Sequence, residues 1–127
     1  MSSDSNENNV KKGIGFGFAF NGILLAFRAE KNFRIHILIA FVVITLGLLV
    51  GLSIVEWLLV SLCIGFVLVT EMINSAIEAL IDHLFPDYHE VAGRVKDLSA
   101  GAVLVAAICT AVIGVIIFLP KIYHIIV

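Results

Sequence analysis

Long uninterrupted apolar runs dominate this chain of 127 residues. Residues 35–55 contain His36 as their only titratable group, and residues 98–119 contain no charged side chain. A helix of about 20 residues crosses the ~30 Å hydrocarbon layer of a bilayer, because each residue adds about 1.5 Å. Both runs are therefore predicted to be membrane-spanning helices.

A third apolar run, residues 57–70, is too short to span a bilayer alone. It continues directly into the stretch EMINSAIEALID, residues 71–82. A spanning helix in this region must therefore carry Glu71 within it. The spanning helices are expected over residues 34–51, 55–83 and 97–119.

The remaining segments are expected to lie outside the hydrocarbon. Residues 1–9 are polar and predict a disordered tail. Residues 10–29 carry lysines first, then aromatic side chains, then Arg28, a pattern typical of an amphipathic helix on the membrane surface. Residues 84–96 predict a polar connection, and Pro120 is expected to close the last span. The fold class is thus an all-α membrane protein with a single domain over residues 10–127.

Composition excludes several functions. The chain is 61% hydrophobic and 14% charged, with a net charge of −2, so no basic surplus suggests a nucleic acid partner. A dinucleotide-binding loop that begins in GIGFGF, residues 13–18, needs glycine at position 18 or 20, where the chain has Phe18 and Phe20. Cys63 and Cys109 lie inside apolar runs and are expected to pack as inert side chains.

Basic residues predict the orientation in the membrane, because lysine and arginine are enriched in cytoplasmic segments. The basic residues before the first span are Lys11, Lys12, Arg28, Lys31 and Arg34. Arg94 and Lys96 lie between the second and third spans, whereas the first turn has none. The amino terminus and the connection over residues 83–97 are therefore expected in the cytoplasm, with the carboxyl terminus outside.

Four polar residues, Glu71, Asn74, Glu78 and Asp82, share one face of the second spanning helix. A carboxylate near hydrocarbon costs at least ~2–3 kcal/mol, so it indicates a functional site. With Trp57 at the outer interface, Glu71 lies about 21 Å further in, within the inner leaflet. A lipid hydroxyl reaches this depth from the membrane, and ATP reaches the end of the helix from the cytoplasm.

This pattern suits phosphoryl transfer, which needs a metal ion on the phosphates and a base at the attacking hydroxyl. Glu78, joined by Glu30 from the end of the surface helix, is a candidate magnesium ligand. Glu71, deeper and less hydrated, is the candidate base, and Asn74 is placed to orient it or to contact a phosphate. Arg94 and Lys96 are candidate phosphate ligands, and Asp97 is placed to orient the lysine or contact the nucleotide.

Each candidate also has an ordinary structural explanation. Glu71 is neutralised by an interhelical partner in one alternative, and Glu78 and Asp82 belong to a solvated helix end in another. Basic residues near spans serve as membrane anchors in many proteins. Participation of Asp82, His36, His83 and His89 stays open.

Two other protein classes are alternatives to an enzyme. A small proton-coupled exporter also uses carboxylates inside the membrane. In this chain, however, the carboxylates gather toward the cytoplasmic end rather than the midplane. A di-iron carboxylate bundle requires an ExxH motif on two helices, and the chain contains none.

The segments AEKNFRIH, EMINSAIEALID and YHEVAGRVKDLSAGAVL resemble the signatures of the prokaryotic diacylglycerol kinase family, which includes the undecaprenol kinases. The resemblance covers roughly residues 13–120, with the motifs in matching order and spacing. It implies one surface helix and three spanning helices in a bacterial inner-membrane protein. It also implies a homotrimer whose active sites lie between subunits.

The activity that this resemblance implies is MgATP-dependent phosphorylation of a lipid hydroxyl. By motif position, Glu71 matches the catalytic base, and Glu30 and Glu78 match the metal-binding carboxylates. Asn74 matches the asparagine beside the base, and the pair Lys96 and Asp97 matches the nucleotide-binding residues.

The acceptor lipid is less sharply indicated. The segment FNGILLAFRAEKNFRIH, and His36 in particular, is more similar to undecaprenol kinases, since proteobacterial diacylglycerol kinases tend to have an acidic residue at that position. The segments NSAIE and YHEVAGRVKD are equally similar to diacylglycerol kinases. Undecaprenol is the expected acceptor and diacylglycerol the alternative.

Overall fold

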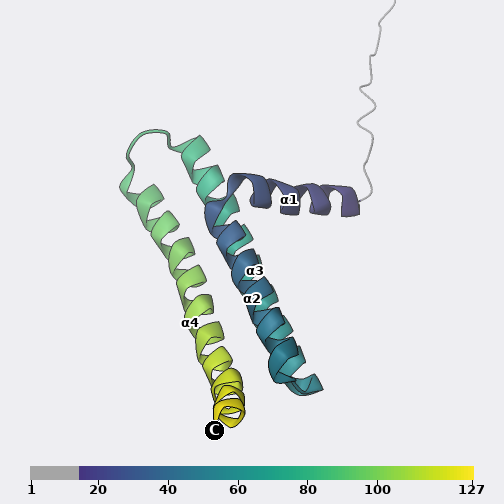
Figure 1. The fold of residues 1–127 in the computed structure, drawn as a ribbon. Helices are drawn as coiled ribbons and strands as arrows, with labels where there is room; N and C mark the ends of the chain where they lie inside the picture. Colours follow the sequence, from purple (N-terminus) through teal and green to yellow (C-terminus); the bar gives the residue numbers. More distant parts are fainter. Residues whose placement is uncertain (1–14) are drawn as a thin grey trace, which may run out of the picture.

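The computed structural model describes residues 15–127 as four α-helices (Figure 1). Their bounds are α1 Gly15–Ala29, α2 Lys31–Val50, α3 Ile54–Leu84 and α4 Glu90–Ile126. The helices α2, α3 and α4 are each long and apolar enough to cross a membrane. The expected all-α fold with three long apolar helices and a shorter amino-terminal one is confirmed. The tail expected over residues 1–9 lies outside the described residues, as do residues 10–14.

The three long helices pack through side chains that recur at every seventh position. The buried positions at this spacing are Phe33, Ala40 and Gly47 on α2; Val60, Val67 and Asn74 on α3; and Ala92, Ser99 and Ala106 on α4, while Glu71 and Ile117 are also buried. Side chains repeating at this spacing form a seam along which helices supercoil and interlock. The most extensive packing is between α3 and α4.

The turn between α2 and α3 is built from two helix caps. Gly51 adopts a left-handed conformation with φ 70°, and its N–H donates to the Gly47 carbonyl at 3.1 Å. Glycine takes this conformation without a Cβ clash, so it ends α2 cleanly. Ser53 and Glu56 then form a capping box, in which the Ser53 N–H donates to Glu56 Oε2 at 2.6 Å.

The carboxyl-terminal end of the chain differs from the expectation. Pro120 does not close the third span, because α4 continues through it to Ile126. Lys121, the next residue, reaches back to the α2–α3 turn, where its Nζ lies 3.1 Å from Glu56 Oε2 and donates to the Gly51 carbonyl at 3.3 Å. Pro120 removes only one backbone N–H donor from the helix. The contacts of Lys121 hold the helical segment that follows the proline.

The connection between α3 and α4 is shorter than the polar segment expected over residues 84–96, because α4 begins at Glu90. His89 caps the helix, its Nδ1 accepting from the Ala92 N–H at 3.4 Å. Glu90 and Arg94 pair one turn apart on the exposed surface of α4. These local contacts extend the helix over Gly93, which the sequence pattern alone treats as part of a loop.

Helix α1 projects sideways from the other three, near the end where α3 finishes and α4 begins (Figure 1). Arg34 on α2 fastens this arrangement, since its Nη1 donates to the carbonyls of Arg28 at 3.0 Å and Phe27 at 3.3 Å. Arginine thereby satisfies carbonyls that the end of α1 leaves without a partner. The angle between α1 and α2 is thus set by a specific contact.

Gly47 gives a test of the packing at the α2–α3 turn. A Cβ at this position would lie 2.8 Å from Leu52 Cδ1 and 2.9 Å from Trp57 Cη2, whereas one at Gly65 meets nothing within 4 Å. Gly47→Leu is expected to cost about 1–3 kcal/mol of stability through overpacking. The measurement is the thermal midpoint of unfolding in detergent micelles, with Gly65→Leu as the matched control. Equal midpoints for the two variants would contradict this packing.

Candidate functional site

Buried polar side chains gather where the second half of α3 packs against the beginning of α4. Glu71 and Asn74 on α3 are 2% and 6% exposed, and Ser99 on α4 is 9% exposed. Polar groups buried among apolar helices are costly unless they are hydrogen-bonded, so such a cluster indicates a function or a specific structural role.

A chain of hydrogen bonds links this cluster across the two helices. The Ser99 hydroxyl donates to Asn74 Oδ1 at 2.7 Å, and Asn74 Nδ2 donates to Glu78 Oε1 at 3.1 Å. Asn74 therefore uses both ends of its amide, one toward α4 and one along α3. The Glu78 carboxylate is half-buried and receives a fixed donor.

Glu71 lies among several other titratable groups. Glu78, Glu30 and His36 are close enough to its carboxyl group to interact with it electrostatically. Glu30 stands at the junction of α1 and α2, where it is the N-cap residue but makes no side-chain capping hydrogen bond. The structure therefore brings together Glu71, Asn74, Glu78 and Glu30, four of the residues that the sequence singled out.

Lys96 of α4 lies beside the carboxyl-terminal end of α3, where its Nζ donates to Asp82 Oδ1 at 2.8 Å. The two side chains are 37% and 64% exposed. Asp82, whose part the sequence left open, is thus the partner of Lys96. An exposed ion pair of this kind contributes only about 0–1 kcal/mol, so a phosphate group can displace it at low cost.

Arg94 and Asp97 are not brought into the cluster. Both are exposed on α4, and Arg94 is engaged by Glu90 on its own helix. Of the histidines left open, His89 caps α4 and stacks on Phe85 with ring centroids 4.7 Å apart, and His83 is exposed.

Ser99 is the member of the cluster that the sequence analysis missed. It is a hydroxyl within a largely apolar helix, 25 residues from Asn74 along the chain. One signal was present, because Ser99 lies seven residues from Ala92 and from Ala106. That spacing places it on the packed seam of α4 rather than on the lipid-facing side.

The carboxylates suit magnesium only in company with phosphate. Within residues 15–127, no group of three or more histidine, cysteine, aspartate or glutamate side chains is arranged to hold a metal ion. Magnesium is commonly held by one or two carboxylates, with substrate phosphates and water completing its shell. Glu78 and Glu30 supply hard oxygen donors of that kind, so the donor set fits a metal that arrives with a nucleotide.

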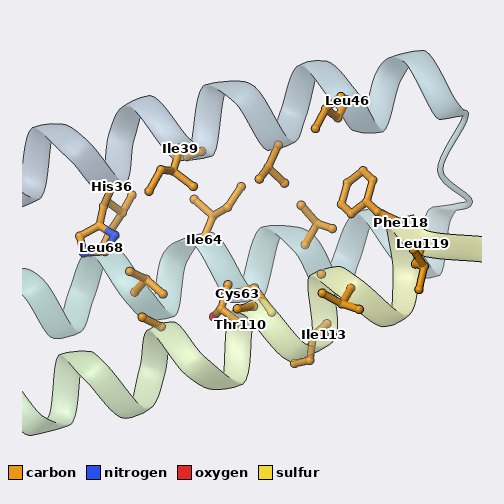
Figure 2. Close-up of a pocket in the computed structure, with 18 of the residues that line it drawn as sticks. His36, Ile39, Leu46, Cys63, Ile64, Leu68, Thr110, Ile113, Phe118 and Leu119 are labelled. Atoms are coloured by element: carbon orange, nitrogen blue, oxygen red, sulfur yellow. The ribbon is translucent and has the colours of Figure 1, made fainter. Parts of the chain in front are cut away.

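An apolar cavity of about 520 Å³ lies between α2, α3 and α4 (Figure 2). His36 stands at one end, and Phe118 and Leu119 stand at the other (Figure 2). Its lining is otherwise almost entirely aliphatic or aromatic, with Thr110 and Cys63 among the few polar exceptions. The end at His36 is the end near Glu71. The cavity thus ends on the side of the polar cluster, at His36.

The fold and the site together define an all-helical membrane protein with a carboxylate-rich centre at one end of its spanning helices. The model of the prokaryotic diacylglycerol kinase family matches residues 17–118. The chain therefore belongs to the prokaryotic diacylglycerol kinase family of membrane lipid kinases, as the sequence motifs indicated. This membership makes the chain a phosphotransferase with an alcohol acceptor and sets aside the exporter alternative.

The relatives of this chain include proteins named undecaprenol kinase and proteins named diacylglycerol kinase. The chain is 39% identical to the undecaprenol kinase of Bacillus subtilis over 122 residues, which cover 95% of this chain and 99% of that protein. It is 36% identical to the diacylglycerol kinase of a Synechocystis species, covering 84% of this chain and 62% of that protein. It is 29% identical to the diacylglycerol kinase of Escherichia coli, covering 76% and 79% of the two chains.

The buried hydrogen-bond chain predicts that substituting Asn74 destabilises the protein more than substituting Asp82, another polar residue of α3. Asn74→Ala leaves the Ser99 hydroxyl and the Glu78 carboxylate without their shared partner, which is expected to cost about 1–3 kcal/mol. Asp82→Asn removes an exposed ion pair and is expected to cost about 1 kcal/mol or less. Denaturant midpoints of the purified variants in detergent measure both. A larger loss for Asp82→Asn would contradict the assignment of Asn74 to the packed seam.

Proposed function

We propose that this protein uses ATP and magnesium to phosphorylate the hydroxyl of undecaprenol, giving undecaprenyl phosphate. The observation that carries the proposal is the burial of Glu71 within a membrane-spanning helix, beside Glu78 and Glu30. A carboxylate buried at this depth can act as a general base that accepts the proton of a lipid alcohol. The full-length similarity to a relative named undecaprenol kinase supports the choice of acceptor.

Glu71 is the proposed base. The acceptor hydroxyl donates a hydrogen bond to its carboxylate, and the proton passes to Glu71 as the lipid oxygen bonds to the γ-phosphorus of ATP. The bond between that phosphorus and the bridging oxygen breaks, and ADP leaves with the bonding electron pair. Positioning of the two oxygens in line is the main contribution that a protein makes to this kind of transfer.

Glu78 and Glu30 are the proposed magnesium ligands. A magnesium ion held there with the nucleotide would neutralise charge on the β- and γ-phosphates. The two carboxylates come from different parts of the chain, the carboxyl-terminal part of α3 and the α1–α2 junction. Asn74 contributes by holding Glu78, to which its amide is already hydrogen-bonded.

Lys96 is the proposed phosphate ligand on α4. Its partner Asp82 keeps the ammonium group at the site end of the two helices until phosphate oxygens replace the carboxylate. Asp97, the next residue, and Arg94, one turn from Glu90, are proposed contacts of the nucleotide. Arg94 would have to leave Glu90 to make that contact.

The apolar cavity supports a long-chain acceptor. It leads from His36, near Glu71, along the inner sides of α2, α3 and α4. A polyprenyl chain buries apolar surface along such a path, and each buried CH₂ contributes about 0.8 kcal/mol. Diacylglycerol, which also carries long apolar chains, is the alternative acceptor.

The assembly and topology are proposed from the resemblance and the charge pattern. The protein forms a homotrimer in the bacterial inner membrane, with active sites completed by neighbouring chains. Its amino terminus and the α3–α4 connection face the cytoplasm, because Arg28, Lys31 and Arg34 lie at one end and Arg94 and Lys96 at the same end. The carboxyl terminus then lies outside.

Glu71→Gln is expected to lower phosphate transfer by about 10²–10⁴-fold, because the amide cannot accept the hydroxyl proton. The assay follows labelled ATP with magnesium and undecaprenol in mixed micelles, and circular dichroism checks the fold. Asp87→Asn, which changes an exposed carboxylate of the α3–α4 connection, is the matched control and should stay near the wild-type rate. Near-normal turnover by Glu71→Gln would remove Glu71 from the role of base.

Gly114 tests the path of the acceptor chain. It lines the cavity, and a Cβ there meets nothing within 4 Å, so a leucine is expected to project into the space without unfolding the protein. Gly114→Leu should raise the KM for undecaprenol about tenfold and leave the KM for ATP unchanged. Gly65→Leu, away from the cavity lining, is the control, and size-exclusion chromatography monitors assembly.

The same assay, run in parallel with undecaprenol and diacylglycerol, decides the acceptor. A higher kcat/KM for undecaprenol supports the proposed reaction. A higher value for diacylglycerol would overturn the choice of lipid and leave the roles of Glu71, Glu78 and Glu30 intact.

A further inference from the structure

Ser99 occupies a place where its hydroxyl affects two helices at once. It is buried on the packed seam of α4 and faces Asn74 of α3. Its Oγ lies 2.7 Å from Asn74 Oδ1 and 2.9 Å from the backbone carbonyl oxygen of Lys96. A hydroxyl has a single hydrogen to donate, so these two acceptors share one donor.

The contact with Asn74 determines which way the asparagine amide points. Its oxygen accepts from Ser99, and its nitrogen therefore faces Glu78 Oε1, at 3.1 Å. Oxygen and nitrogen ends of an amide differ in hydrogen-bonding character. Without the Ser99 donor, the oxygen would be left unpaired in a buried place, and only the bond from Nδ2 to Glu78 would hold the amide.

The contact with the Lys96 carbonyl ties the same hydroxyl to the turn of α4 that carries the proposed phosphate ligand. Ser99 thus lies between two groups of proposed site residues. On one side are Asn74 and Glu78 of α3, and on the other are Lys96 and Asp97 of α4.

We infer that Ser99 is a positioning residue of the kinase site, which fixes the Asn74 amide and through it holds the Glu78 carboxylate ready for magnesium bound with ATP. The inference rests on the proposed function, since it assigns Glu78 to the metal. Ser99 touches neither substrate nor phosphate in this role. Residues that orient a metal ligand commonly change metal affinity by about 10–100-fold when they are removed.

The first arm of the test is a magnesium titration of phosphate transfer. Ser99→Ala is expected to raise the magnesium concentration for half-maximal activity about tenfold, with little change in the KM for lipid. Ser99→Thr, which keeps the hydroxyl, should restore most of the wild-type value. The matched control is Ser75→Ala, because the Ser75 hydroxyl bonds to the Glu71 backbone carbonyl of its own helix at 3.0 Å.

The second arm needs neither metal nor activity. Protein labelled with ¹⁵N-asparagine is studied in micelles, and the side-chain amide of Asn74 is assigned from its loss in Asn74→Ala. Ser99→Ala should shift this resonance and speed exchange of its hydrogens with solvent, whereas Ser75→Ala should do neither. If Ser99→Ala does not fold, Ser99→Cys, a weaker donor of similar size, should show intermediate effects in both arms.

Several results would overturn the inference. These are an Asn74 resonance unchanged in Ser99→Ala, an unchanged magnesium requirement, or equal effects of Ser75→Ala. Failure of the proposed function is distinguishable, because a wild-type protein that phosphorylates no lipid would refute the kinase role of the site. The magnetic resonance arm would still decide whether Ser99 holds Asn74.

Discussion

The hydrogen bond between Ser99 and Asn74 sets the alignment of the two helices that carry most of the site. Both residues lie on seams whose other buried positions at seven-residue spacing are apolar: Val60 and Val67 on α3, and Ala92 and Ala106 on α4. A slip of one heptad along α4 would place Asn74 opposite an alanine and leave its amide without this partner. In an apolar surrounding that loss is costly, so a single polar layer specifies one register among several that pack alike. The register in turn decides which side chains of α4 meet the carboxylates of α3.

The two ends of the helical bundle are fastened with different strength. At one end, Lys121 pairs with Glu56 and bonds to the Gly51 carbonyl, and the charged side chains are only 28% and 26% exposed. At the other end, the Lys96–Asp82 pair is more open to solvent. Less hydrated ion pairs are less screened, so the end away from the site is the firmer one. With this asymmetry, Lys96 in its proposed role would exchange its carboxylate partner for phosphate without loosening the fold.

The sequence predicts those parts of the architecture that depend on residues close to one another along the chain. The lengths of the apolar runs were sufficient to predict three long helices. The alignment of Glu71, Asn74 and Glu78 followed from the helical period alone, because they share one helix face. The extent of α4 did not follow from local rules, since Gly93 and Pro120 ordinarily interrupt helices. Contacts of His89 and of Lys121 extend the helix, and the second of these joins residues 70 apart.

Ser99 and Asp82 were harder to place for the same reason. Each meets its partner only after α3 and α4 fold back on one another, 25 residues apart for Ser99 and 14 for the Asp82–Lys96 pair. The sequence identified the carboxylates because charge in an apolar segment is conspicuous. It gave no comparable signal for the Ser99 hydroxyl, which bonds to Asn74.

Glu30 extends this dependence on tertiary contacts beyond α3 and α4. It follows α1 directly, in extended backbone, so its position relative to Glu71 depends on the angle at which α1 leaves α2. That angle is held by Arg34, whose guanidinium group bonds to the final carbonyls of α1. A basic residue near a membrane boundary therefore does more here than anchor the chain. By fixing α1, Arg34 determines where one of the two proposed metal ligands stands, and Ser99 is inferred to act on the other through Asn74.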